Sequence, residues 1–175
     1  MYRKLTGSII LLLALAACAP AQPLPKDLKT GYEELDAKLA KMVTVDDNAI
    51  SAKAANGLAD ALFLDAREPD EYAVSHLPGA KLLGYSEIDW SQLRGVDKSR
   101  PVVVYCTVGY RSERVARDLR ERGFERVYNL YGSLYAWALA GLPLEGPDGQ
   151  RTRRIHTYNK RWGTFIPDTV GEKTY

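Results

Sequence analysis

Short apolar runs alternate along the chain with segments of helical spacing or composition. The apolar runs, each typical of a buried strand, are 61–65, 81–83, 102–105 and 127–130. The helical segments are 31–42, 50–61, 112–123 and 133–140, with a shorter helix opening at Glu68-Pro69 and an irregular, helix-bearing connection over 85–99. This alternation predicts one α/β domain with a mostly parallel sheet and helices on both faces.

The stretch 102–112 combines the features of a strand, a tight loop and a helix start. The apolar run ends at Cys106, and Gly109 lets the chain turn before a helix that opens at Ser112. The free N–H groups of this helix would point towards the cysteine sulfur. Because such a field stabilises a thiolate, Cys106 is predicted to be a nucleophile.

A cysteine at the end of a strand can also be an inert core residue, since cysteine is among the most buried residue types. Gly109 and Arg111 favour the reactive alternative for Cys106. A glycine turn and an arginine on the same loop are typical of an anion-binding site.

The first residues have the pattern of a secretory signal peptide. A basic start precedes an apolar segment that is shorter than the roughly 20 residues of a membrane-spanning helix. The segment ends in Leu15-Ala16-Ala17-Cys18, which resembles the lipobox of bacterial lipoproteins. Residues 1–17 are therefore expected to be removed and Cys18 to be lipidated, although an ordinary signal-peptidase site near the same alanines is the alternative.

Residues 18–31 would then form a lipidated N-terminus and a proline-rich tether. This predicts a protein anchored by lipid in the bacterial cell envelope. Ala19 after the lipidated cysteine is typical of an outer-membrane destination in a two-membrane cell. In a one-membrane cell the anchor would be the plasma membrane.

Charge and cysteine content change once the signal peptide is removed. The chain has 24 basic and 22 acidic side chains, and loss of Arg3 and Lys4 leaves the mature protein formally neutral. A nucleic-acid partner is therefore not expected. Of the 2 cysteines, Cys18 would carry lipid, so Cys106 would be the free thiol of the mature protein, with no intramolecular disulfide.

Three stretches together resemble the motifs of rhodanese-like sulfurtransferase domains. They are LFLDAREPDEY at 62–72, SHLPGA at 75–80 and CTVGYRS at 106–112, in the order and spacing of that family. On this resemblance the domain is expected over 32–146. A shift to basic and aromatic residues marks an extension over 147–175, which would dock on the domain, meet anionic lipid or remain solvated.

The resemblance implies a mechanism in which Cys106 carries sulfane sulfur as a persulfide. The thiolate would take sulfur from a donor such as thiosulfate and pass it to cyanide or a thiol, with no metal or organic cofactor. The active-site loop residues, whose backbone amides would surround the sulfur, are Thr107, Val108, Gly109, Tyr110 and Arg111. A monomer is expected.

The resemblance also assigns supporting roles. Arg111 would attract an anionic donor or, paired to Asp65 or Glu71, only shape the loop. Asp65 and Arg67 would support that loop. His76 lies in a structural turn of the family and is not expected to be catalytic.

Two other residue groups are not expected to take part in the chemistry. His156 has no partner that the sequence identifies. The acids Glu68, Asp70 and Glu71 are expected to be the charged first turn of a helix.

Two other function classes use the same cysteine. One is a non-catalytic rhodanese-like sensor or binding module at the membrane, and the other is a Cys-based phosphatase or arsenate reductase. Such phosphatases need five residues between Cys and Arg to wrap a phosphate, whereas four separate Cys106 from Arg111. The shorter loop favours sulfur transfer.

Overall fold

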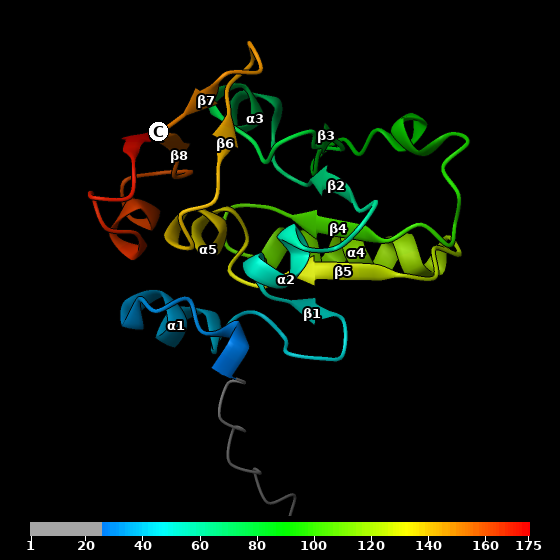
Figure 1. The fold of residues 1–175 in the computed structure, drawn as a ribbon, viewed down its shortest axis with the longest axis horizontal. Coiled ribbons are helices and arrows are strands. Elements are labelled where there is room, and N and C mark those ends of the chain that lie inside the picture. Colours follow the sequence, from blue (N-terminus) through cyan, green and yellow to red (C-terminus); the bar gives the residue numbers. More distant parts are fainter. Residues whose placement is uncertain (1–25) are drawn as a thin grey trace, which may run out of the picture.

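The computed structural model describes residues 26–175 and contains a five-stranded parallel sheet with helices on both faces (Figure 1). The strand order is β1-β5-β4-β2-β3. The strands are Ala49–Ile50 (β1), Leu62–Asp65 (β2), Lys81–Leu82 (β3), Val102–Tyr105 (β4) and Val127–Leu130 (β5). The expected α/β architecture is confirmed, and β4 lies at the centre of the sheet. The signal peptide, Cys18 and most of the tether lie outside the described residues.

The helices connect these strands. They are Glu33–Leu39 (α1), Ala52–Asn56 (α2), Pro69–Val74 (α3), Tyr110–Glu121 (α4) and Ser133–Leu139 (α5), with 3-10 turns at Lys26–Leu28 (η1), Trp90–Leu93 (η2) and Trp162–Phe165 (η3). The expected start of α4 at Ser112 was wrong by one half-turn, because Gly109 caps the helix and Tyr110 is its first residue. Strand β1 was missed, since two residues carry too little pattern to indicate a strand.

Alternate residues of β4 pack in two separate apolar layers, one on each face of the sheet. Val103 and Tyr105 pack with residues of α1, α2 and α5. Val102 and Val104 face the opposite layer, which α4 covers. Successive side chains of a strand point to opposite faces of the sheet, and both faces are apolar here. All four residues of β4 are therefore apolar in the sequence.

The C-terminal part of the chain folds back onto the domain beside α5 (Figure 1). Leu144–Glu145 (β6) and Arg151–Thr152 (β7) form an antiparallel hairpin that spans residue 146, where the sequence places the domain end. Arg154–His156 (β8) pairs in parallel with Glu172–Thr174 (β9). Ile155 and Ile166 are buried in the layer that α5 covers, so this segment is part of the packed structure.

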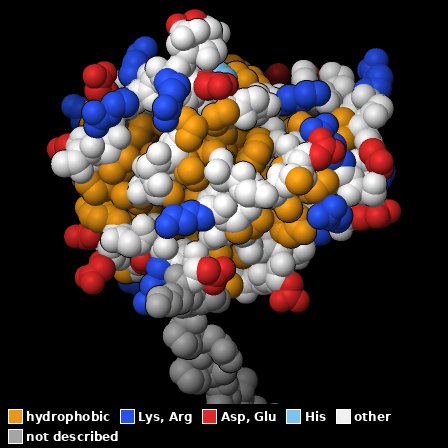
Figure 2. Space-filling model, in the orientation of Figure 1, with side chains coloured by type: hydrophobic (Ala, Val, Ile, Leu, Met, Phe, Trp, Pro, Cys, Tyr) orange, Lys and Arg blue, Asp and Glu red, His pale blue; other side chains and the backbone are white. Residues whose placement is uncertain are grey.

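The surface carries mixed charge. Figure 2 shows apolar side chains in patches separated by basic and acidic ones on the face viewed. None of the helices formed by residues 26–175 combines the length and the apolar character that a membrane crossing requires.

Candidate active site

Cys106 lies directly after the central strand β4, where the chain turns into α4. The residue is only 1% exposed, yet it lines a pocket at this edge of the sheet. Gly109 adopts a φ of 112°, a left-handed conformation that other residues rarely adopt. The glycine therefore allows the loop to fold back over the sulfur within four residues.

The loop directs hydrogen-bond donors at the cysteine sulfur. The Gly109 N–H donates to Sγ over 3.1 Å, and the Ser112 hydroxyl lies 3.6 Å from Sγ. Among the described residues, the backbone N–H groups of Thr107, Val108, Tyr110 and Arg111 meet no protein acceptor. These groups and the N-terminus of α4 form a cradle for negative charge beside the sulfur.

Two opposing effects set the pKa of Cys106. Burial raises the pKa of this thiol, whereas the Arg111 charge and hydrogen bonds from Ser112 and Gly109 lower it. The lowering effects together are larger, so the net pKa is below the ordinary cysteine value. The thiolate is the nucleophilic form of cysteine. These contacts favour the thiolate form of the buried sulfur, which a nucleophilic role of Cys106 would require.

Polar side chains from β5 and α5 hold the loop in place. The Ser112 hydroxyl donates to Asn129 Oδ1 over 2.7 Å, and Asn129 Nδ2 donates to the Gly109 carbonyl over 3.1 Å. Ser133 Oγ accepts from the Cys106 N–H over 3.0 Å and donates to the Leu130 carbonyl. Asn129 and Ser133 were not predicted from the sequence, although a polar residue inside the apolar run 127–130 is a signal that could have identified Asn129.

Glu71 holds Arg111 at the edge of the pocket. Its carboxylate accepts two hydrogen bonds from the Arg111 guanidinium, over 2.6 and 2.7 Å, and one from the Thr107 hydroxyl over 3.1 Å. Burial raises the pKa of Glu71, but its contacts with Arg111 lower that pKa below the ordinary value. Arg111 therefore shapes the loop through Glu71, one of the two partners that the sequence left open.

The other candidate partner, Asp65, pairs instead with Arg67. Both side chains are completely buried, and Asp65 accepts from Arg67 Nε and Nη2 over distances of 2.7 to 3.1 Å. Arg67 Nη2 also donates to the Ser75 carbonyl. This pair ties the end of β2 to the segment after α3.

The histidines lie outside the cysteine pocket. His76 stacks on Tyr72 with ring centroids 3.9 Å apart, as expected of a structural turn. His156 lies in β8, where burial lowers its pKa, and its Nδ1 accepts the Tyr158 N–H over 3.1 Å. Asp70 is exposed in the first turn of α3.

The pocket above Cys106 has a volume of about 440 Å³. Its walls include the loop residues Thr107, Val108, Tyr110 and Arg111, together with Met42, Glu68, Tyr85, Ser86, Tyr158 and Trp162. Tyr158 and Trp162 come from the C-terminal segment, which was not predicted from the sequence to line the site. Within residues 26–175 there is no cluster of three or more His, Cys, Asp or Glu residues that could hold a metal ion.

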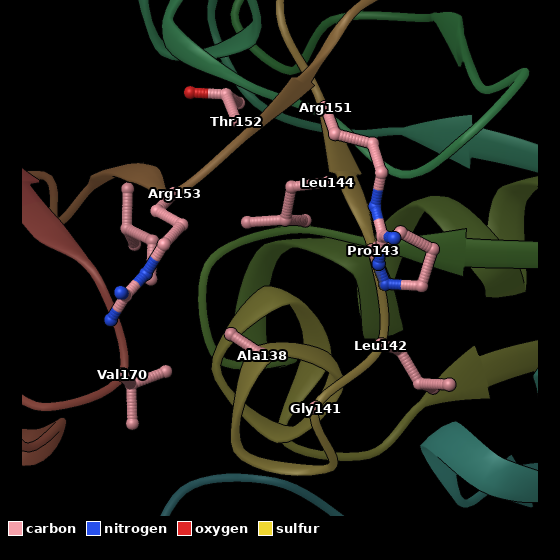
Figure 3. Close-up of a pocket in the computed structure, with 10 residues that line it drawn as sticks. Ala138, Gly141, Leu142, Pro143, Leu144, Arg151, Thr152, Arg153 and Val170 are labelled. Carbon is pink, nitrogen blue, oxygen red and sulfur yellow. The ribbon is translucent and has the colours of Figure 1, made fainter.

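A second pocket, of about 360 Å³, lies between α5, the β6–β7 hairpin and the C-terminal segment (Figure 3). Arg151, Arg153, Leu142 and Val170 are among its lining residues. It shares no lining residue with the cysteine pocket.

Comparisons with known proteins match this geometry. The family model described as Rhodanese-like domain matches residues 46–140. A protein named sulfurtransferase from Allochromatium vinosum is 36% identical over 105 residues, which are 60% of this chain and 96% of that protein. The thiosulfate sulfurtransferase GlpE of Coxiella burnetii is 37% identical over 79 residues, 45% of this chain and 72% of that protein.

A solved structure shows the same fold. The rhodanese-like domain of a protein from Anabaena superposes with a TM-score of 0.52 at 27% identity, over 58% of this chain and 80% of that one. The family match at residues 46–140 includes the five strands of the sheet, Cys106 and its loop.

Proposed function

The chain belongs to the rhodanese-like domain family, and on that premise we propose that it is a sulfurtransferase that carries sulfane sulfur as a persulfide on Cys106. The observation that carries the proposal is the loop around the thiol. A buried cysteine with a lowered pKa faces N–H donors from a loop that is too short to enclose a phosphate. Two relatives, 36% and 37% identical, are named sulfurtransferase and thiosulfate sulfurtransferase.

In the first step the Cys106 thiolate attacks the outer, sulfane sulfur of a donor such as thiosulfate. A new S–S bond forms to Sγ while the S–S bond of thiosulfate breaks, and sulfite leaves with the electron pair of that bond. The persulfide keeps a negative charge on its outer sulfur. The free N–H groups of the loop and the N-terminus of α4 stabilise that charge.

In the second step a nucleophilic acceptor, cyanide or a thiolate, attacks the outer sulfur of the persulfide. The new bond forms to the acceptor, the persulfide S–S bond breaks, and Cys106 takes back the electron pair as a thiolate. The lowered pKa of Cys106 makes it a good leaving group in this step. The cycle is balanced without an oxidant or reductant.

The proposal is tested by turnover of the full chain purified in detergent, with thiosulfate as donor and cyanide as acceptor. Formation of thiocyanate by the wild type and its loss in Cys106→Ser support the proposal. Cys18→Ser is the matched cysteine control and retains turnover. A wild type that binds thiosulfate without turnover would indicate a sensor, and hydrolysis of an aryl phosphate would indicate a phosphatase.

A lipid anchor on Cys18 is the second part of the proposal. It is supported by Leu15-Ala16-Ala17-Cys18 and by the proline-rich residues that follow. The anchor would hold the enzyme at the bacterial envelope. Replacement of Cys18 by Ser is expected to abolish incorporation of labelled fatty acid in cells and to change membrane fractionation; unchanged labelling and fractionation would contradict the anchor.

A further inference from the structure

Two aromatic residues that line the Cys106 pocket, Tyr158 and Trp162, lie beyond the family match at residues 46–140. We infer that Tyr158 and Trp162 form a subsite for the carbon skeleton of an organic sulfur compound, which selects a low-molecular-weight organic thiol over an inorganic acceptor. This inference rests on the proposed sulfurtransferase function. It assigns a role in specificity to the C-terminal segment.

The pocket is large enough for a small organic molecule. Its volume of about 440 Å³ lies in the range of sites for such ligands. Thiosulfate has five non-hydrogen atoms and cyanide has two, so either would fill only a part of this volume. The space bordered by Tyr158 and Trp162 remains for a larger molecule.

The lining of the pocket carries no net formal charge. Arg111 and Glu68 are the charged residues of its lining, and they have opposite sign. Arg111 is engaged by Glu71, and Glu68 Oε1 accepts from the Ser86 N–H and hydroxyl over 3.2 and 2.7 Å. The remaining lining residues are uncharged, and four of them, Tyr85, Tyr110, Tyr158 and Trp162, are aromatic, which suits an apolar carbon skeleton.

Trp162 is held rigidly at the pocket wall. Its backbone N–H donates to Asn159 Oδ1 over 3.0 Å, and its carbonyl accepts from the Tyr135 hydroxyl over 3.1 Å. The Trp162 ring packs against Phe165 at 5.5 Å between centroids, and the Lys38 ammonium lies 5.2 Å from the Trp162 ring. A ring fixed in this way binds a ligand without first losing conformational freedom.

Tyr158 reaches the pocket through an unusual backbone. Its φ of 66° lies in the left-handed region, which bulky residues rarely adopt. Its N–H is held by His156 Nδ1, and its ring lies 5.4 Å from the Arg111 guanidinium carbon. Such conformations concentrate at functional sites, and this one places a tyrosine that is 55% exposed beside the active-site loop.

The subsite is tested first by the alkylation of Cys106, which needs a thiolate but no sulfur transfer. Rates with N-benzyl iodoacetamide and with iodoacetamide are compared in the full chain, and the reaction is assigned to Cys106 by peptide mass spectrometry. The wild type is expected to favour the benzyl reagent. Tyr158→Ala and Trp162→Ala are each expected to reduce this preference about tenfold.

Tyr175→Ala is the matched control, since Tyr175 is an exposed aromatic residue of the same segment that does not line the pocket. It retains the wild-type preference. A wild type without preference for the benzyl reagent, or Tyr158 and Trp162 variants that keep that preference in full, would overturn the subsite.

A second measurement links the subsite to turnover. Cys106 loaded with sulfur from thiosulfate is discharged with benzyl mercaptan or with cyanide, and the ratio of the two rate constants is expected to fall about tenfold in the same two variants. An unchanged ratio overturns the role in acceptor choice. If no sulfur loads onto wild-type Cys106, the proposed function fails, and the alkylation rates still decide whether the subsite exists.

Discussion

Arg67 and Arg111 each form a two-point ion pair with a carboxylate, but Arg67 is sealed inside the protein whereas Arg111 borders the Cys106 pocket. The Asp65–Arg67 pair is completely buried, and its Arg67 Nη1 has no hydrogen-bond partner among the described residues. The side chains of the Glu71–Arg111 pair are 4% and 15% exposed, respectively. The same kind of ion pair therefore lies wholly inside the fold at Arg67 and at the wall of the cysteine pocket at Arg111.

The difference follows from what lies beside each arginine. Arg67 contacts Asp65 and the Ser75 carbonyl, so its charge is used entirely inside the fold. Arg111 lines the pocket with Cys106, and its charge lowers the pKa of that thiol. Four predictions test this division, from the largest expected effect to the smallest.

Arg67→Met is expected to cause the largest loss, about 3–5 kcal/mol in the free energy of unfolding, because it leaves the Asp65 carboxylate buried and unpaired. Urea unfolding measures it. Arg100→Met is the control, since it breaks an exposed pair with Asp60 and should change stability little. An equal loss of unfolding free energy in the two variants would contradict a stabilising role of the buried Arg67.

Arg111→Met is expected to cost less stability, on the order of 2 kcal/mol, because this pair is partly exposed and the carboxylate that loses its partner is less completely buried than Asp65. Its main effect is on Cys106. Without the Arg111 charge the pKa of the thiol rises, so the midpoint of iodoacetamide alkylation moves to higher pH. An unchanged midpoint would show that Arg111 does not tune the thiol.

Glu71→Gln is expected to reduce stability near neutral pH by about 1–2 kcal/mol. The pKa of Glu71 is lowered in the folded protein, so the stability that its carboxylate contributes is present above the unfolded pKa. It is lost as the pH falls through the folded pKa. The free energies of unfolding of the wild type and Glu71→Gln, measured with urea, should therefore converge as the pH drops from about 6 towards 3. A difference that stays constant with pH would contradict a contribution from the ionised Glu71 carboxylate.

Ser112→Ala is expected to produce the smallest of these effects. It removes the hydroxyl that lies 3.6 Å from the Cys106 sulfur but leaves the Ser112 backbone N–H and the Arg111 charge in place. The alkylation midpoint should move to higher pH by less than in Arg111→Met. A larger shift than that of Arg111→Met would assign the lowered pKa to hydrogen bonding and not to charge.

The sequence predicted the parts of this molecule that depend on local pattern. The apolar runs located strands β2 to β5, and Cys106, Gly109 and Arg111 identified the loop, because strand period, turn chemistry and loop length are properties of neighbouring residues. Glu71 was one of two possible partners for Arg111. The choice between Glu71 and Asp65 required the packing of α3 against the loop.

Features that depend on distant segments were not predicted. Asn129 acquires its role only because β5 pairs with β4 and brings its side chain to Ser112 and Gly109. Tyr158 and Trp162 reach the pocket because the C-terminal segment folds back through short strand pairs of two or three residues. Such short pairs have too little periodicity to be recognised from a single sequence.

The central claim is that sulfur is carried on Cys106, and the intact mass of the full chain tests it most directly. After incubation with thiosulfate and removal of the excess, the wild type is expected to gain the mass of one sulfur atom, located by peptide mapping on Cys106. Addition of cyanide should remove that mass. No gain in the wild type, or an equal gain in Cys106→Ser, would contradict the account.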